Sequence, residues 1–218
     1  MSYRTRVKFC GITRSEDVRL AVDLGADALG FILYPKSKRA LSFEQMKPLV
    51  DAVPVWVSSV VLLVNSSVAE VNEVIESIRP DYLQFHGDET AEFCEQFNYP
   101  YIRAIRVGAP GISTPEEIAQ AAAEYKQAKA FIFDAYSPDY GGAGISFDAS
   151  LLSVVREQQT KEKIVIAGGL HSQNIRLLIE QYQPFGVDLC SGVESEPGHK
   201  DSAKMQRFMT ELKLGNVI

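Results

Sequence analysis

Short apolar runs recur along the chain at intervals of roughly two dozen residues, separated by stretches with helical periodicity. The runs are rich in β-branched and aromatic residues and are too short for helices, so each predicts a buried strand. The eight runs cover residues 7–13, 28–33, 58–64, 82–86, 101–107, 131–144, 164–170 and 187–194.

The stretches between the runs carry recognisable helix starts, each with a Ser or Thr at an N-cap position. Such a hydroxyl accepts hydrogen bonds from the free backbone N–H groups of the first turn, and a Glu or Gln three residues later completes a capping box. The predicted caps are Thr13 with Glu16, Ser42 with Gln45, Thr114 before Pro115 and Glu117, and Ser172.

The alternation of strands and helices predicts a parallel sheet with right-handed crossovers, either closed as a barrel or open and doubly wound. Eight strands favour the closed (β/α)8 TIM barrel. A Rossmann-type open sheet usually has a GxGxxG turn after its first strand, whereas residues 10–13, CGIT, contain one glycine. We therefore expect an α/β fold with a single (β/α)8-barrel domain over residues 1–218 and a site at the C-terminal ends of the strands.

The chain is acidic, with a formal net charge of −6 over 218 residues, so it offers no basic field to a nucleic acid. No apolar stretch approaches the roughly 18 residues of a membrane span, and residues 1–10 lack the apolar segment of a signal peptide. The three cysteines, Cys10, Cys94 and Cys190, form no CxxC pair. These features predict a reduced, cytoplasmic protein with neither nucleic acid nor membrane as a partner.

Lys8 and Cys10 occupy the same face of the first strand, about 7 Å apart, because side chains alternate along a strand. If that face points into the barrel, the Lys8 ammonium is expected to lower the pKa of the Cys10 thiol and enrich the thiolate. Cys10 would then be a general base. The alternative is a small hydrophobic residue in a core, which is what most free cysteines are.

Asp134 closes the FIFD segment of the sixth run, on the face of Ile132 and opposite Phe131 and Phe133. Burial and a neighbouring thiolate would favour its neutral carboxylic form, which suits a general acid. Its alternative role is to bond the loop that follows, with its GGAG turn at 141–144.

Small residues end the last two runs: Gly168 and Gly169 in the seventh, Ser191 and Gly192 in the eighth. These two loops commonly bind phosphate in (β/α)8 barrels, through backbone N–H groups that face the anion. The two turns together predict a phosphate site, although either glycine pair alone is commonly just a tight turn.

The loop after the second run gathers Lys36, Lys38 and Arg39. Such a charge run is usually a solvated loop, but at the site it would hold an anionic group, and the planar guanidinium of Arg39 suits a carboxylate best. His86 shares the inward face of the fourth strand with Gln84 and is more often a hydrogen-bonded structural residue than a catalyst, so it is only a possible supporting residue.

The motifs of the chain, taken in order, resemble those of the phosphoribosylanthranilate isomerase family, an enzyme of tryptophan biosynthesis. The resemblance extends from the first strand to the last helix. It rests on VKFCGIT, GFILYPKSKR, LQFHGDE, IRAIRV, the FIFDA…GGAG…FD segment, IAGGL…N and VDLCSGVE…PGHKD.

The resemblance implies an Amadori rearrangement of N-(5-phosphoribosyl)anthranilate, without metal or organic cofactor. It assigns Cys10 as the general base at sugar C2 and Asp134 as the general acid at the ring oxygen. It also implies that Arg39 contacts the anthranilate carboxylate, that the GG and SG turns bind phosphate, and that Asp188 binds a sugar hydroxyl. The expected partner is this small phosphosugar, bound to a monomer or homodimer.

Several positions depart from the family pattern. Ala143 replaces a threonine, Ala149 an aromatic residue and Cys190 a serine, and residues 37–40, SKRA, lack a proline after the serine. None of them is the proposed acid or base, so we expect effects on loop packing and affinity more than on chemistry.

Other functions remain open from the residues alone. A metal-dependent epimerase needs clustered ligands, whereas the three histidines are His86, His171 and His199. A Schiff-base enzyme such as an aldolase needs a strand-end lysine, and Lys8 is the only strand lysine. Another phosphosugar enzyme, such as an indole-glycerol-phosphate synthase, or a phosphate-binding barrel without catalysis would share the same fold.

Overall fold

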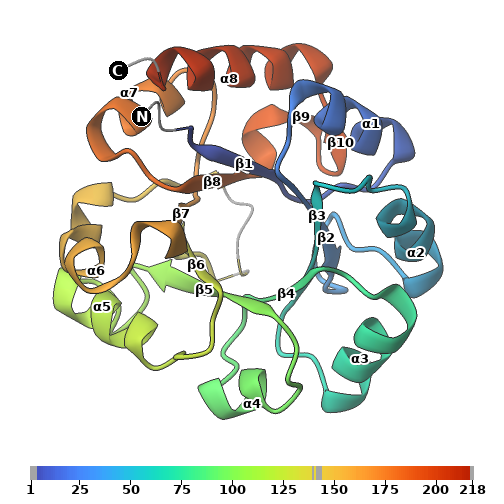
Figure 1. The fold of residues 1–218 in the computed structure, drawn as a ribbon, viewed down its shortest axis with the longest axis horizontal. Coiled ribbons are helices and arrows are strands. Elements are labelled where there is room, and N and C mark those ends of the chain that lie inside the picture. The colour runs from blue at the N-terminus through green and yellow to red at the C-terminus, as the bar shows by residue number, and fades with distance from the viewer. Residues whose placement is uncertain (1–3, 139, 141–143, 217–218) are drawn as a thin grey trace.

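The computed structural model describes residues 4–138, 140 and 144–216. Within these residues, eight parallel strands close into a barrel in chain order, with β1 paired to β8 (Figure 1). Each strand overlaps the apolar run that predicted it, so the (β/α)8 fold class is confirmed. The strands are β1 (Arg6–Phe9), β2 (Ala28–Leu33), β3 (Ser58–Leu63), β4 (Tyr82–Phe85), β5 (Tyr101–Val107), β6 (Ala130–Ala135), β7 (Ile164–Ile166) and β8 (Gly186–Leu189).

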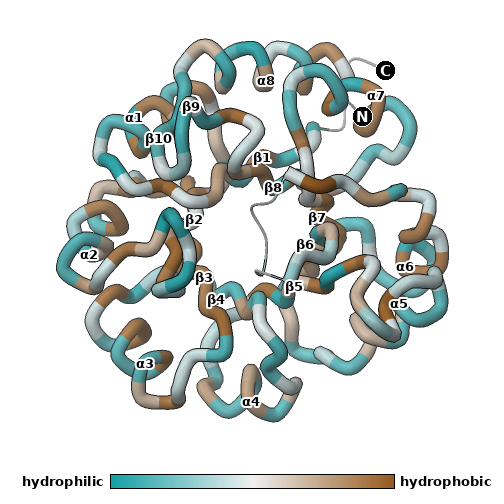
Figure 2. The backbone as a smooth tube through the Cα atoms, turned by 180° about the vertical axis from the view of Figure 1, so that it is seen from behind, coloured by the Kyte–Doolittle hydropathy of each residue, from teal (hydrophilic) through white to brown (hydrophobic). Residues whose placement is uncertain are grey.

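Helices surround the barrel, and Figure 2 shows that they mix hydrophilic and hydrophobic positions while the strands are mainly hydrophobic. A short antiparallel pair, β9 (Glu194–Glu196) and β10 (His199–Lys200), follows β8 outside the barrel. The helices are α1 (Ser15–Leu24), α2 (Phe43–Asp51), α3 (Val68–Glu73) with a π-helical turn (Val74–Ile78), α4 (Ala91–Glu95), α5 (Pro115–Ala123), α6 (Ser153–Gln158), α7 (Ile175–Tyr182) and α8 (Ser202–Gly215). Short 3-10 turns lie at Ala149–Leu152, Lys161–Lys163 and Ser191–Val193.

The core lies mainly between the outward faces of the strands and the helices, where Phe131 and Phe133 of β6 are almost fully buried. A separate small hydrophobic cluster lies on the inside of the barrel, formed by Cys10, Ile32, Leu62 and Val64. Alternate residues of each strand therefore face different environments, which carries side chains such as Asp134 inward toward the site.

The predicted caps at Ser42 and Thr114 are confirmed, since both residues form full capping boxes with Gln45 and Glu117. The cap predicted at Thr13 is wrong. Helix α1 begins at Ser15 without a side-chain cap, because the Thr13 hydroxyl donates to the carbonyl of Gly198 in the β9–β10 turn.

The cap predicted at Ser172 is also wrong, because α7 begins three residues later, at Ile175. The side chain of Asn174 instead accepts from the backbone N–H of His171 at 2.9 Å and donates to the carbonyl of Gly169 at 2.9 Å. Asn174 therefore braces the loop after β7, where sequence reasoning expected a serine to begin the helix.

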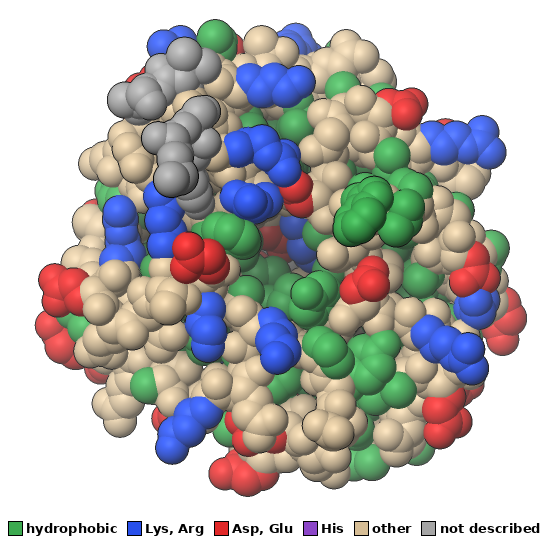
Figure 3. Space-filling view, in the orientation of Figure 1, with side chains coloured by type: hydrophobic (Ala, Val, Ile, Leu, Met, Phe, Trp, Pro, Cys, Tyr) green, Lys and Arg blue, Asp and Glu red, His purple; other side chains and the backbone are tan. Residues whose placement is uncertain are grey.

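The face of the molecule seen in Figure 1 mixes basic, acidic and hydrophobic side chains (Figure 3). Val55 and Trp56 are the most exposed large hydrophobic residues in the described part of the chain, in the loop between α2 and β3. None of the described helices has both the length and the apolar character needed to cross a bilayer.

Candidate active site

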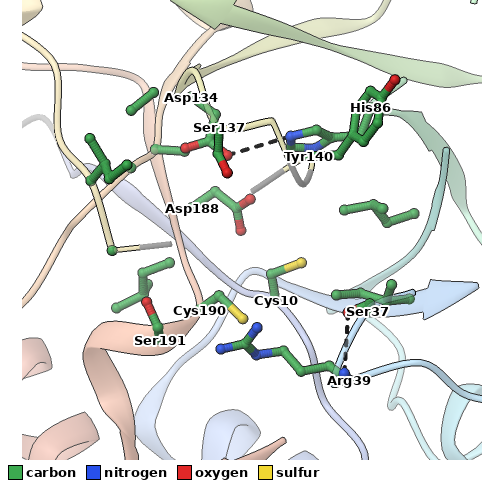
Figure 4. Close-up of a pocket in the computed structure, with 18 of the residues that line it drawn as sticks. Cys10, Ser37, Arg39, His86, Asp134, Ser137, Tyr140, Asp188, Cys190 and Ser191 are labelled. Atoms are coloured by element: carbon green, nitrogen blue, oxygen red, sulfur yellow. Dashed lines mark hydrogen bonds and ion pairs between the residues drawn. The ribbon is translucent and has the colours of Figure 1, made fainter. Parts of the chain in front are cut away.

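A cavity of about 500 Å³ opens where the strands end, lined by the βα loops and by inward-facing strand residues. All of the predicted site residues except Lys8 line it (Figure 4): Cys10, Arg39, His86, Asp134, Gly168, Gly169, Asp188, Ser191 and Gly192. The barrel brings these residues together because parallel strands end at the same rim.

Cys10 and Lys8 share one face of β1, as strand alternation predicted, and the fold turns that face into the barrel. A Cβ atom placed on Gly30 of β2 would lie 2.8 Å from Cys10 Sγ and 2.9 Å from Lys8 Nζ. Glycine at position 30 therefore leaves the room that the thiol and the ammonium occupy. The Lys8 Nζ lies 3.0 Å from Asp188 Oδ1, and both side chains are buried.

The pKa of the Cys10 thiol is raised, which corrects the expectation that Lys8 brings it below its ordinary value. Burial is the largest effect and disfavours the thiolate, and the Asp188 carboxylate adds to it. Lys8 favours the thiolate, as predicted, and Lys200 acts in the same direction, but both are outweighed. The resting thiol is therefore protonated.

The pKa of Lys8 is raised as well. Burial opposes this shift, and the charge and hydrogen bond of the Asp188 carboxylate are the main effects that favour the ammonium. Lys8 is thus held as an ammonium, which has no lone pair with which to attack a carbonyl. The charged state of Lys8 therefore argues against a Schiff-base mechanism at this lysine.

Asp134 is the next-to-last residue of β6, on the inward face, and lies beside His86, with Oδ2 at 3.4 Å from Nε2 (Figure 4). The other ring nitrogen of His86 lies 3.0 Å from Nε2 of Gln84. The buried His86 Nε2 has no hydrogen bond within the described residues, and it faces the Asp134 carboxylate. His86 is therefore a neighbour of Asp134 in the pocket wall, as well as a partner of Gln84.

The loops after β7 and β8 pack against each other closely. A Cβ atom on Gly192 would lie 1.9 Å from the carbonyl oxygen of Leu170, a contact that no side chain tolerates. Gly168 has a φ of +84°, and a Cβ there would lie 3.0 Å from Asp134 Oδ1. The small residues predicted to bind phosphate thus form one continuous wall of the cavity, next to Asp134.

Arg39 lies in the loop after β2, and its guanidinium is paired with Glu194, with Nη2 at 2.6 Å from Oε2. Gly11 makes room for its stem, because a Cβ there would lie 2.6 Å from Arg39 Cδ. The side chain of Arg39 is buried, yet it forms part of the cavity wall together with Lys36 and Lys38.

Glu194 and Lys200 were not identified from the sequence as site residues. Lys200 is fully buried, and its Nζ lies 2.9 Å from Glu194 Oε1 and 2.7 Å from the carbonyl oxygen of Cys10. Lysine and glutamate side chains are rarely buried unless they are paired. The sequence pointed to these two residues only through the SGVE and GHKD segments, which were noted as family motifs.

A second group of polar residues lies near the rim, where Tyr140 donates to the Asp88 carboxylate and the guanidinium of Arg106 stacks on the Tyr140 ring at 4.5 Å.

The described residues contain no group of three or more His, Cys, Asp and Glu side chains arranged to hold a metal ion.

Comparisons with known proteins identify the family. The model of the N-(5'phosphoribosyl)anthranilate (PRA) isomerase family matches residues 7–211. The chain belongs to this isomerase family. It is 43% identical to the N-(5'-phosphoribosyl)anthranilate isomerase of Bordetella pertussis over 210 residues, 96% of each chain.

Solved structures of phosphoribosylanthranilate isomerases share the fold. The enzyme of Thermotoga maritima aligns with a TM-score of 0.84 and 35% identity over 96% of this chain and 98% of its own. A second, with a TM-score of 0.82 and 33% identity over the same shares, was solved in complex with reduced 1-(o-carboxyphenylamino)-1-deoxyribulose 5-phosphate.

The departures from the phosphoribosylanthranilate isomerase pattern occupy different places. Ala143 lies outside the described residues. Ala149 begins a 3-10 turn and is buried in the main core, where a bulky aromatic ring would need other packing. Cys190 Sγ lies 3.7 Å from Glu194 Oε1 and 3.8 Å from Lys200 Nζ, and burial raises the pKa of its thiol to about 12.

Proposed function

We propose that this chain catalyses the Amadori rearrangement of N-(5-phosphoribosyl)anthranilate to 1-(2-carboxyphenylamino)-1-deoxyribulose 5-phosphate in tryptophan biosynthesis. The observation that carries the proposal is the presence of Cys10, Asp134 and Arg39 in one cavity with two glycine-rich turns. The isomerase names of the relatives support it.

Asp134 is the general acid in this proposal. It gives a proton to the ring oxygen of the sugar while the nitrogen lone pair displaces that oxygen from C1, which leaves an open chain with a protonated imine. The thiolate of Cys10 then removes the proton from C2, and the electron pair of the C–H bond forms the C1–C2 double bond of an enolamine. Tautomerisation of the enolamine, with a proton gained at C1 and one lost from the C2 hydroxyl, yields the ketone.

The electrostatics of Cys10 suit a base that acts on carbon. A raised pKa makes the thiolate a stronger base toward the C2 proton, at the cost of a smaller deprotonated fraction. Lys8 and Lys200 limit that cost, because their charges favour the thiolate. Asp188 keeps the Lys8 ammonium in place and lines the cavity, where its second oxygen is a candidate to accept a hydrogen bond from a sugar hydroxyl.

The two anionic ends of the substrate are held by different groups in this proposal. The backbone N–H groups of Gly168, Gly169, Ser191 and Gly192 bind the phosphate, and Arg39 binds the anthranilate carboxylate. No metal or organic cofactor takes part. We also propose that the chain is one domain and acts in the cytoplasm, as a monomer or homodimer.

The test is a fluorescence assay that follows the loss of the anthranilate adduct. Turnover that saturates with substrate is the expected result. If the protein binds the substrate but produces no turnover at saturation, it is a phosphate-binding barrel without this chemistry. If it neither binds nor converts the adduct, the substrate assignment is wrong.

A further inference from the structure

Glu194 holds the guanidinium of Arg39 by one edge. Arg39 Nε lies 2.9 Å from Oε1 and 3.1 Å from Oε2 of Glu194, and Nη2 lies 2.6 Å from Oε2. Nη1 has no hydrogen bond with any residue that the structure describes. A guanidinium offers its Nε–Nη2 side and its Nη1–Nη2 end as separate bidentate edges. Glu194 therefore occupies the Nε–Nη2 side of the Arg39 guanidinium and leaves its Nη1–Nη2 end available to a second carboxylate.

Lys200 fixes Glu194 in turn. Its Nζ lies 2.9 Å from Glu194 Oε1, 2.7 Å from the carbonyl oxygen of Cys10 and 3.2 Å from that of Cys190. These three acceptors match the three hydrogens of the ammonium. Cys10 directly follows β1 and Cys190 directly follows β8. The position of Arg39 is therefore tied to the strand end that carries the proposed base.

The charges of this cluster leave an excess of positive charge at the cavity wall. Arg39 and Lys200 are two cations that share one carboxylate, Glu194, and all three side chains are buried. The Cys190 thiol beside them is neutral, because its pKa is raised to about 12. A substrate carboxylate that meets the free end of Arg39 would balance the cluster and gain charge-assisted hydrogen bonds.

We propose that Glu194, anchored by Lys200, is a positioning residue that sets the orientation in which Arg39 receives the carboxylate of the substrate. Glu194 itself does not touch the substrate. This inference rests on the proposed function, since it concerns the group that distinguishes an anthranilate from a plain aromatic amine.

The experiment compares the affinities of two probes. One is reduced 1-(o-carboxyphenylamino)-1-deoxyribulose 5-phosphate, and the other is the same compound made with aniline, which lacks the carboxylate. Their Kd values are measured by calorimetry for the unmodified protein, Glu194→Gln, Glu194→Asp and Lys200→Met. The ratio of the two Kd values reports the preference for the carboxylate and is insensitive to general damage that affects both probes alike.

Glu89→Gln is the matched control, because Glu89 and Arg103 form a second buried pair, with Oε2 at 2.9 Å from Nη1, and neither lines the cavity. In the unmodified protein we expect a clear preference for the carboxylated probe. Glu194→Gln and Glu194→Asp should each reduce this preference at least about tenfold, because the guanidinium loses its bidentate brace. Lys200→Met should reduce it as well, and Glu89→Gln should leave it unchanged.

The sign of the Glu194→Gln result is decisive. If Glu194 acted only as a counter-charge, its removal would leave more positive charge at the wall and strengthen binding of the carboxylated probe. An unchanged or increased preference in Glu194→Gln overturns the inference. Should that variant fail to fold, an unchanged preference in Glu194→Asp, which keeps the charge and shortens the reach, overturns it equally. Equal affinities of the unmodified protein for the two probes would instead contradict the proposed role of Arg39 itself.

Discussion

The ammonium of Lys8 lies 3.0 Å from the carboxylate of Asp188 inside the barrel, on the inward face that also carries the Cys10 thiol. This pair places a fixed positive charge near the thiol and a negative charge beside it. The two charges act on the thiol pKa in opposite directions, so burial decides the net shift upward. The pKa of Cys10, at the rim, therefore depends on a buried pair in which Asp188 lines the cavity and Lys8 does not.

Lys8→Met should move the acidic limb of the kcat/KM pH profile to higher pH. Lys8 lowers the pKa of the Cys10 thiol, so its loss raises that pKa, and the unpaired Asp188 carboxylate adds to the rise. If the thiolate is the active form, activity then appears only at higher pH. Lys47→Met, which breaks an exposed pair on α2, should leave the profile in place. A profile unchanged in Lys8→Met would remove Lys8 from the tuning of Cys10.

Cys10→Ala should lower kcat by at least about a hundredfold, because no other group takes the C2 proton. The measurement is steady-state turnover of the anthranilate adduct. Cys94→Ala is the matched control, since Cys94 is also a buried free cysteine but lies in α4 and does not line the cavity. Turnover preserved in Cys10→Ala would exclude the thiol as the base.

Asp134→Asn should also lower kcat by at least about a hundredfold, because an amide cannot donate an acidic proton to the ring oxygen. The amide keeps the shape of the carboxyl group, so substrate affinity should change less than turnover. Asp23→Asn, on an exposed position of α1, should behave like the unmodified protein. Equal turnover in the two variants would place the acid elsewhere.

Arg39→Ala should mainly raise KM, because the carboxylate that Arg39 binds does not take part in bond changes. Loss of Arg39 also leaves Lys200 as the remaining cation paired with Glu194, so the circular dichroism and thermal unfolding of the variant are measured beside its kinetics. A fall in kcat with an unchanged KM would place Arg39 at the transition state instead.

Gly192→Ala should weaken phosphate binding and raise KM. The new methyl group would lie 1.9 Å from the carbonyl oxygen of Leu170, so the loops after β7 and β8 must move apart. Gly186→Ala, in β8, is the control, because its methyl group would lie 3.5 Å or more from its neighbours. Phosphate-analogue affinity, measured by calorimetry, should fall in the first variant and persist in the second.

Much of the site was accessible from the sequence because its residues stand at fixed places in a repeating unit. The rim positions of Cys10 and Asp134 follow from the ends of the predicted strands, and strand alternation places Cys10 on the face of Lys8 and Asp134 on the face of Ile132. Which of these faces points inward was decided by the fold. Local reasoning failed for two helix caps. The Thr13 hydroxyl donates to the carbonyl of Gly198 instead of capping α1, and α7 begins at Ile175, three residues after Ser172.

The sequence alone therefore determined the eight strands, the closed barrel and the set of side chains at its rim, since these depend on local periodicity and on the count of units. The tertiary structure decided how those side chains are charged and held. Lys8 meets Asp188 across 180 positions and Arg39 meets Glu194 across 155. Burial and partner choice depend on such distant segments, so the raised pKa of Cys10 and the bracing of Arg39 became visible only in the folded chain.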